Sequence, residues 1–67
     1  MDARENGLAF HHVEHRLRGR QVVDTRSLRE GELMAVMAEA GGDLVAYIRG
    51  ADHREFDAPL DCVRPAR

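Results

Sequence analysis

The sequence predicts a mainly β protein, a small barrel of about five short strands. The strongest observation is a pair of apolar stretches, residues 32–40 and 43–49, joined by Gly41 and Gly42. Two adjacent glycines adopt positive φ without steric cost, so the pair suits a primed two-residue hairpin turn. The stretch 43–49 also contains valine, tyrosine and isoleucine, which favour strands. We therefore expect a hairpin at the centre of the fold.

A second hairpin is predicted nearer the start of the chain. Residues 8–17 and 20–25 flank a turn at Arg18 and Gly19. Read as a strand, 8–17 has its more apolar face on the side that includes Val13 and Leu17. The two stretches are therefore expected to pair with each other.

The last third of the chain supplies the closing elements. A polar turn at 51–53 precedes a short alternating run, a kink at Pro59, and a final apolar pair, Cys62 and Val63. This order of two hairpins, a tight turn and a short last strand resembles a small SH3-like or Tudor-like barrel, in which a single helical turn introduces the closing strand. The resemblance concerns the fold, and such barrels have unrelated functions.

An α+β alternative stays open, with a helix at 28–40 packed on a small antiparallel sheet. Residues 27–30, Ser-Leu-Arg-Glu, have the spelling of a capping box at a helix start. Helical spacing i, i+3, i+4, i+7 also relates four apolar residues, Leu33, Val36, Met37 and Ala40. Gly31 disfavours the helix by up to about 1 kcal/mol, and the hairpin explains the following residues better.

The 67 residues predict one small domain over 8–65, preceded by a flexible tail at 1–7. The single cysteine, Cys62, excludes an internal disulfide, so association of subunits is the remaining source of extra stability. Val45 and Tyr47 lie on the opposite face of their strand from the other apolar residues. We expect a homo-oligomer with these two residues in the contact.

The same composition indicates a soluble cytoplasmic protein with no membrane association. The sequence has no signal-peptide core and no apolar run near about 18 residues. It has no nucleophile elbow, phosphate-binding glycine loop or dinucleotide fingerprint. We therefore expect no enzyme, no catalytic residue and no cofactor.

Charge is distributed unevenly along the chain. Residues 1–29 contain six arginines and four acids, whereas residues 30–67 contain four arginines and eight acids. Arg16, Arg18 and Arg20 would project to one side if a strand continued through them, which suits phosphate or carboxylate contacts. Nucleic-acid modules usually add stacking aromatics and a net positive charge, and this chain has a net charge of −2.

Residues 11–15, His-His-Val-Glu-His, contain the H-x-x-E-H spelling of inverted zinc peptidases. Such enzymes need a third ligand and a cleft in a far larger fold, so we expect no peptidase. A non-catalytic metal site formed by His11, His15 and His53 is left undecided by the sequence, and half-exposed strand histidines are the simpler interpretation.

These observations predict a small self-associating module that binds a protein partner, without catalysis. The partner-binding residues expected from the sequence are Arg16, Arg18, Arg20, Val45 and Tyr47. The alternative is a weak nucleic-acid-binding barrel that uses the three arginines. The sequence does not identify the ligand or the size of the oligomer.

Overall fold

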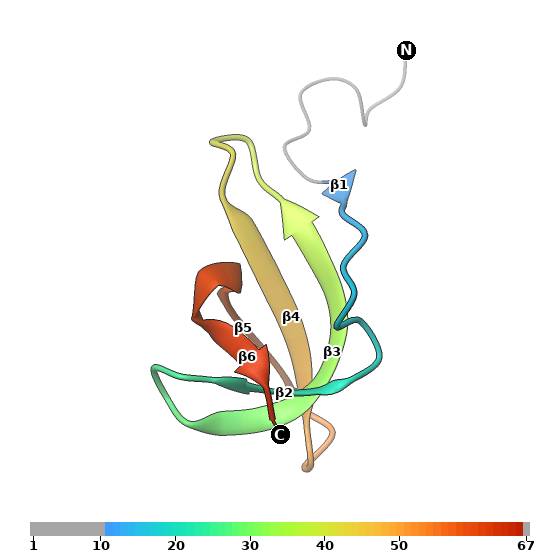
Figure 1. Cartoon of the computed structure of the whole chain (residues 1–67), viewed down its shortest axis with the longest axis vertical. Helices are drawn as coiled ribbons and strands as arrows, with labels where there is room; N and C mark the ends of the chain where they lie inside the picture. Colours follow the sequence, from blue (N-terminus) through green and yellow to red (C-terminus); the bar gives the residue numbers. More distant parts are fainter. Residues whose placement is uncertain (1–10, 67) are drawn as a thin grey trace.

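Strand β3 (Arg29–Ala38) is the longest element and holds the fold together. The computed structural model describes residues 11–66, and β3 pairs there with three other strands (Figure 1). Residues 31–38 of β3 lie beside β4 (Leu44–Gly50), its first four residues lie beside β2 (Gln21–Asp24), and its end lies beside β1 (His11–His12). Figure 1 shows how β3 bends as it passes from one neighbour to the next.

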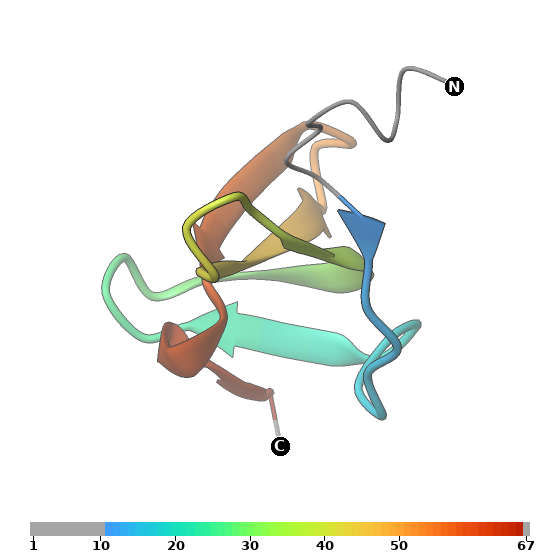
Figure 2. The same cartoon turned by 90° about the horizontal axis from the view of Figure 1, so that it is seen from above.

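The remaining elements complete a six-stranded antiparallel sheet. After β4 come β5 (Glu55–Pro59), the short 3-10 turn η1 (Leu60–Cys62) and β6 (Val63–Pro65). The order across the sheet is β5-β4-β3-β2-β6, and after β5 the chain crosses to the end of β2, where η1 leads into β6 (Figure 2). The mainly β, barrel-like prediction is confirmed, including the helical turn before the last strand. The predicted tail 1–7 and residues 8–10 lie outside the described residues.

A β-bulge explains why part of β3 resembled a helix. Leu33 pairs with Ile48 and Ala35 pairs with Tyr47, so Met34 is an extra residue on β3. A bulge shifts the alternation of faces by one residue. Leu33 and Val36, three apart, are consequently both buried in the same core. The helix predicted as the alternative for 28–40 is wrong, because these residues form a turn and a bulged strand.

The predicted pairing of 8–17 with 20–25 is also wrong. Within the described residues only His11 and His12 of the first stretch form a strand, and they pair with the end of β3. β2 is four residues long and covers only the start of β3, so the remaining edge of β3 is free to accept another segment. The Val13 amide donates to the Val36 carbonyl (2.8 Å) and continues this contact.

The β3–β4 hairpin lies where the glycine pair predicted it, but its turn is of another type. The Gly42 amide donates to the Glu39 carbonyl (2.8 Å), and the Glu39 amide donates to the Asp43 carbonyl (2.9 Å). Gly42 has positive φ (90°) and Gly41 does not, whereas a primed two-residue turn needs positive φ at its first central position (type II′) or at both (type I′). The connection therefore spans residues 39–43, and β3 ends at Ala38.

The core forms inside the curled sheet. Its buried apolar residues come from the first loop and from five strands, β2 to β6: Leu17, Val22, Leu33, Val36, Ala46, Ile48, Ala58 and Val63. On β4 the alternation is as predicted, with Ala46 and Ile48 buried and Val45 and Tyr47 half-buried on the outer face. Among residues 11–66, no helix is long and apolar enough to cross a membrane.

Arg29 covers one side of this core. Its guanidinium carbon lies 3.9 Å from the centre of the Phe56 ring, and Phe56 packs against the buried cluster. We expect Arg29→Ala to lower the free energy of unfolding by about 1 kcal/mol, because a cation–π contact and packing over the ring are both lost. Urea unfolding measures the change, with Arg29→Lys retaining part of it and the exposed Arg16→Ala as a neutral control. Equal stability of Arg29→Ala and the parent chain would show that the stacking contributes nothing.

Candidate binding groove

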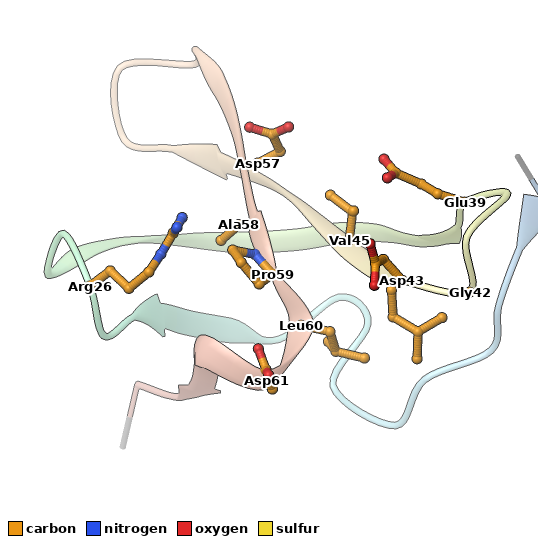
Figure 3. A pocket seen from close by; sticks show the side chains of 11 residues that line it. Arg26, Glu39, Gly42, Asp43, Val45, Asp57, Ala58, Pro59, Leu60 and Asp61 are labelled. Atoms are coloured by element: carbon orange, nitrogen blue, oxygen red, sulfur yellow. The ribbon is translucent and has the colours of Figure 1, made fainter. Parts of the chain in front are cut away.

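An open groove of about 850 Å³ lies beside β5, and we call it the acidic groove. Its walls are the β2–β3 turn, the β3–β4 connection and η1. Figure 3 shows Arg26 at one side and Glu39 and Asp43 at the other, with Ala58 and Pro59 of β5 between them. The residues that line it are Arg26, Glu39, Gly42, Asp43, Leu44, Val45, Asp57, Ala58, Pro59, Leu60 and Asp61.

Most of the charged residues that line the groove are acidic. Four carboxylates and one arginine line it, a formal charge of −3. The uncharged part of the lining is apolar: Leu44, Val45, Ala58, Pro59 and Leu60. Leu44 is one of two large apolar residues that are exposed in the described chain, at 39%. The groove therefore combines an apolar surface with a rim that favours cations.

Direct hydrogen bonds tie two of these walls together, the β2–β3 turn and η1. The Thr25 amide and hydroxyl of the β2–β3 turn both donate to the Cys62 carbonyl of η1, at 2.9 and 3.0 Å. The Arg64 guanidinium donates to the Asp61 and Val63 carbonyls, both at 2.9 Å, and holds the end of η1. Pro59, with φ of −59°, ends β5 immediately before η1. These contacts hold the β2–β3 turn and η1 against each other on one side of the groove.

The wall that carries Arg26 is built around Asp24, a residue that is only 2% exposed. Its carboxylate accepts hydrogen bonds from the Arg26 amide (3.0 Å) and the Ser27 hydroxyl (3.0 Å). The Arg26 guanidinium forms a longer ion pair with it (3.4 Å). Burial alone raises the pKa of Asp24, but these hydrogen bonds and the charge of Arg26 outweigh it and lower the pKa below 3.8. The turn is therefore held by an ionised carboxylate.

Of the residues predicted to bind a partner, Val45 alone lines the acidic groove. Tyr47 lies two residues further along β4, half-buried on the outer face between Ala35 and Asp57. Val45 lies on the same face of β4, with Met37 of β3 and Pro59 of β5 as its cross-strand neighbours. The structure thus places Val45 and Tyr47 on one surface, as predicted, and joins one end of that surface to the groove.

The predicted row formed by Arg16, Arg18 and Arg20 is not present, because these residues occupy a turn. The Arg18 amide donates to the His15 carbonyl (3.1 Å), and the Arg20 amide donates to the Leu17 carbonyl (2.9 Å). In a chain that reverses direction in this way, successive side chains do not point alternately to two faces as they do on a strand. All three arginines are exposed, and none lines the acidic groove.

The histidines considered as metal ligands do not lie together, because His11 and His53 are near opposite ends of β3. His11 pairs with Ala38 near one end of β3, whereas His53 follows Gly50, which pairs with Gly31 near the other end. The ring nitrogen Nδ1 of His15 accepts a hydrogen bond from the Leu17 amide (3.1 Å). Among residues 11–66, no three histidine, cysteine, aspartate or glutamate side chains are close enough together to hold a metal ion. Figure 3 shows Glu39 and Asp43 at the far side of the groove from Arg26, and Asp57 apart from Asp61.

Sequence reasoning missed the acids of the groove. Glu39, Asp43, Asp57 and Asp61 come from three separate segments, and only the curl of the sheet brings them to one surface. The excess of acids in residues 30–67 was the one signal of their importance. This excess indicated an acidic region of the protein but not where on the fold the acids lie. No family model matches the chain, and no curated protein or solved structure matches it either.

Proposed function

We propose that this chain is a small module that binds a protein partner through the acidic groove and catalyses no reaction. The ligand that fits is an extended segment in which arginine or lysine alternates with apolar residues. The formal charge of −3 around an apolar lining is the observation that carries this proposal. Carboxylates spread along a groove suit several charges on an extended chain better than one compact ion.

Two finer statements are part of the same proposal. The order of β2 to β6, with η1 before the closing strand, supports an SH3-like barrel, by analogy of fold alone. Cys62 is a free, half-buried thiol, which suits a reducing compartment, and we propose the cytoplasm as the site of action. Weak nucleic-acid binding through Arg16, Arg18 and Arg20 remains the alternative hypothesis.

Binding of a synthetic probe tests the proposal. We expect a short peptide of alternating leucine and arginine to bind the parent chain, and Asp57→Asn combined with Asp61→Asn to weaken it about tenfold, since each exposed charge pair contributes up to about 1 kcal/mol. Titration calorimetry at two salt concentrations measures this, and the affinity should fall as salt rises. Arg16→Ala combined with Arg18→Ala serves as the control with a distant change.

The control peptide has citrulline in place of arginine, so it keeps the size of the side chain and loses the charge. We expect it to bind markedly more weakly than the arginine peptide. Equal binding of the two peptides, or equal affinity of the parent and the Asp57/Asp61 variant, would exclude the groove as a site for basic segments. Tighter binding of a single-stranded oligonucleotide, abolished by the Arg16/Arg18 change, would instead favour the nucleic-acid alternative.

A further inference from the structure

The β2–β3 turn places a leucine where leucine is disfavoured. Leu28 is 76% exposed, the most exposed large apolar residue of the described chain. Its φ is 65°, in the left-handed region that glycine and asparagine adopt easily and leucine does not. Exposure and an unfavourable backbone both oppose leucine at this position in an isolated copy. A backbone outlier of this kind suggests a functional role.

The same turn is held rigidly by the Asp24 network. The Leu28 amide donates to the Asp24 carbonyl (2.7 Å), and the Arg29 amide donates to the Ser27 hydroxyl (3.3 Å). Two residues before Leu28, Arg26 extends from the turn with a side chain that is 55% exposed. The turn therefore presents one apolar and one cationic side chain in a fixed arrangement. A fixed arrangement lowers the entropic cost of binding.

We infer that this turn, Thr25 to Leu28, docks into the acidic groove of a second copy of the chain. Leu28 would contact the apolar lining, and Arg26 would meet a carboxylate of the groove, that of Asp57 or of Asp61. The groove volume of about 850 Å³ is ample for both side chains. The chemistry of the turn is that of the ligand proposed for the groove, an apolar residue beside a cation, and the inference rests on that proposed function.

The position of the turn favours a closed dimer. Arg26 belongs to the turn and also lines the groove of its own copy. The turn and the groove are therefore neighbours on one surface of the molecule. A two-fold axis beside that shared wall would bring each turn to the groove of the other copy, an isologous contact. The dimer would cover both grooves. Self-association and binding of a basic partner segment would therefore exclude each other.

Sedimentation velocity over a range of concentrations tests the inference with the full chain. We expect the parent chain to self-associate, and Leu28→Asn to associate about tenfold more weakly or worse, because a central apolar contact is lost. Asparagine adopts positive φ readily, so Leu28→Asn should unfold at the same temperature as the parent or a higher one. Leu28→Met is the matched control, since it keeps an apolar side chain and should keep association.

A mixture distinguishes a turn in a groove from other contacts. Leu28→Asn has an intact groove, and Asp57→Asn combined with Asp61→Asn has an intact turn. Each should associate weakly alone, whereas the mixture restores one of the two contacts and should associate more strongly than either. A stable monomer of the parent chain, unchanged association of Leu28→Asn, or a mixture no stronger than its components would overturn the inference. Loss of association in Tyr47→Asp alone would place the contact on the outer face instead.

The same variants separate this inference from the proposed function. If the leucine–arginine peptide binds the groove but Leu28→Asn associates like the parent chain, the inference fails and the proposed function stands. If the peptide does not bind but both variants lose association and the mixture recovers it, the groove serves self-association and the proposed partner function fails. If the proposed function and the self-association both hold, Leu28→Asn should bind the peptide more tightly than the parent chain, because its turn competes less for the groove.

Discussion

Gly31→Ala is expected to lower the free energy of unfolding by about 3 kcal/mol, most of the stability of a domain this small. Gly31 is buried on β3 and pairs with Gly50 of β4. A β-carbon at Gly31 would lie 2.7 Å from the Arg49 carbonyl carbon and 2.8 Å from Cγ2 of Ile48, and it would also clash with the Arg49 carbonyl oxygen. Backbone atoms cannot move aside without breaking the β3–β4 ladder.

Gly41 provides the matched control for this substitution. A β-carbon at Gly41 would meet nothing within 4 Å, and its φ is not in the left-handed region. Gly41→Ala should therefore change the stability by less than about 1 kcal/mol, with a slight increase from the reduced entropy of the unfolded chain. Urea unfolding followed by circular dichroism measures both variants. If Gly31→Ala proved as stable as Gly41→Ala, the close approach of β3 and β4 at Gly31 would be incorrect.

Asp24→Ala is expected to have the second largest effect, a loss of about 2 kcal/mol. The buried carboxylate of Asp24 accepts hydrogen bonds from Arg26 and Ser27 and fixes the β2–β3 turn. Alanine removes the acceptor of these hydrogen bonds, so the turn loses the contacts that hold it. Chemical unfolding should show the loss, and the groove should also lose affinity for the leucine–arginine peptide, because the β2–β3 turn, which carries Arg26 and bonds η1 through Thr25, is no longer held in place. Retained stability and retained peptide affinity would show that the network is dispensable.

Asp24 also makes stability depend on pH. Its pKa is lowered in the folded state from an ordinary value of 3.8, so the fold favours the ionised form. The stabilisation is fully present above pH 3.8 and is lost as pH falls through the lower, folded-state pKa. Asp24→Asn removes this titration while keeping one acceptor oxygen, so its unfolding midpoint should fall less steeply with acid than that of the parent. Identical acid profiles for the two chains would contradict the lowered pKa.

The sequence was informative where local chemistry decides the structure. Gly41 and Gly42 located the central hairpin, and alternation on β4 correctly assigned Ala46 and Ile48 to the core. It misled where one inserted residue changes the pattern. Because Met34 bulges from β3, Leu33 and Val36 share a face at a spacing that also suits a helix. The helix and strand propensities of these residues do not distinguish a helix from a bulged strand.

Long-range pairing was the part that the sequence could not supply. Nothing local shows that His11 and His12 pair with β3 rather than with β2, since both are plausible antiparallel neighbours. The acidic groove has the same origin, because Arg26, Asp43 and Asp61 meet only after the sheet has curled. In the α+β alternative Leu28 belonged to a helix cap, and its exposure became visible only when residues 25–28 proved to be a turn.

The most direct test of the groove as the binding site is amide chemical-shift mapping of the whole chain by nuclear magnetic resonance, titrated with the leucine–arginine peptide. The account predicts that the shifts concentrate in the β2–β3 turn, residues 39–45 and residues 57–61, and that they vanish with the citrulline peptide. Shifts centred on residues 16–20, or on the outer face around Tyr47 with the groove unaffected, would contradict it.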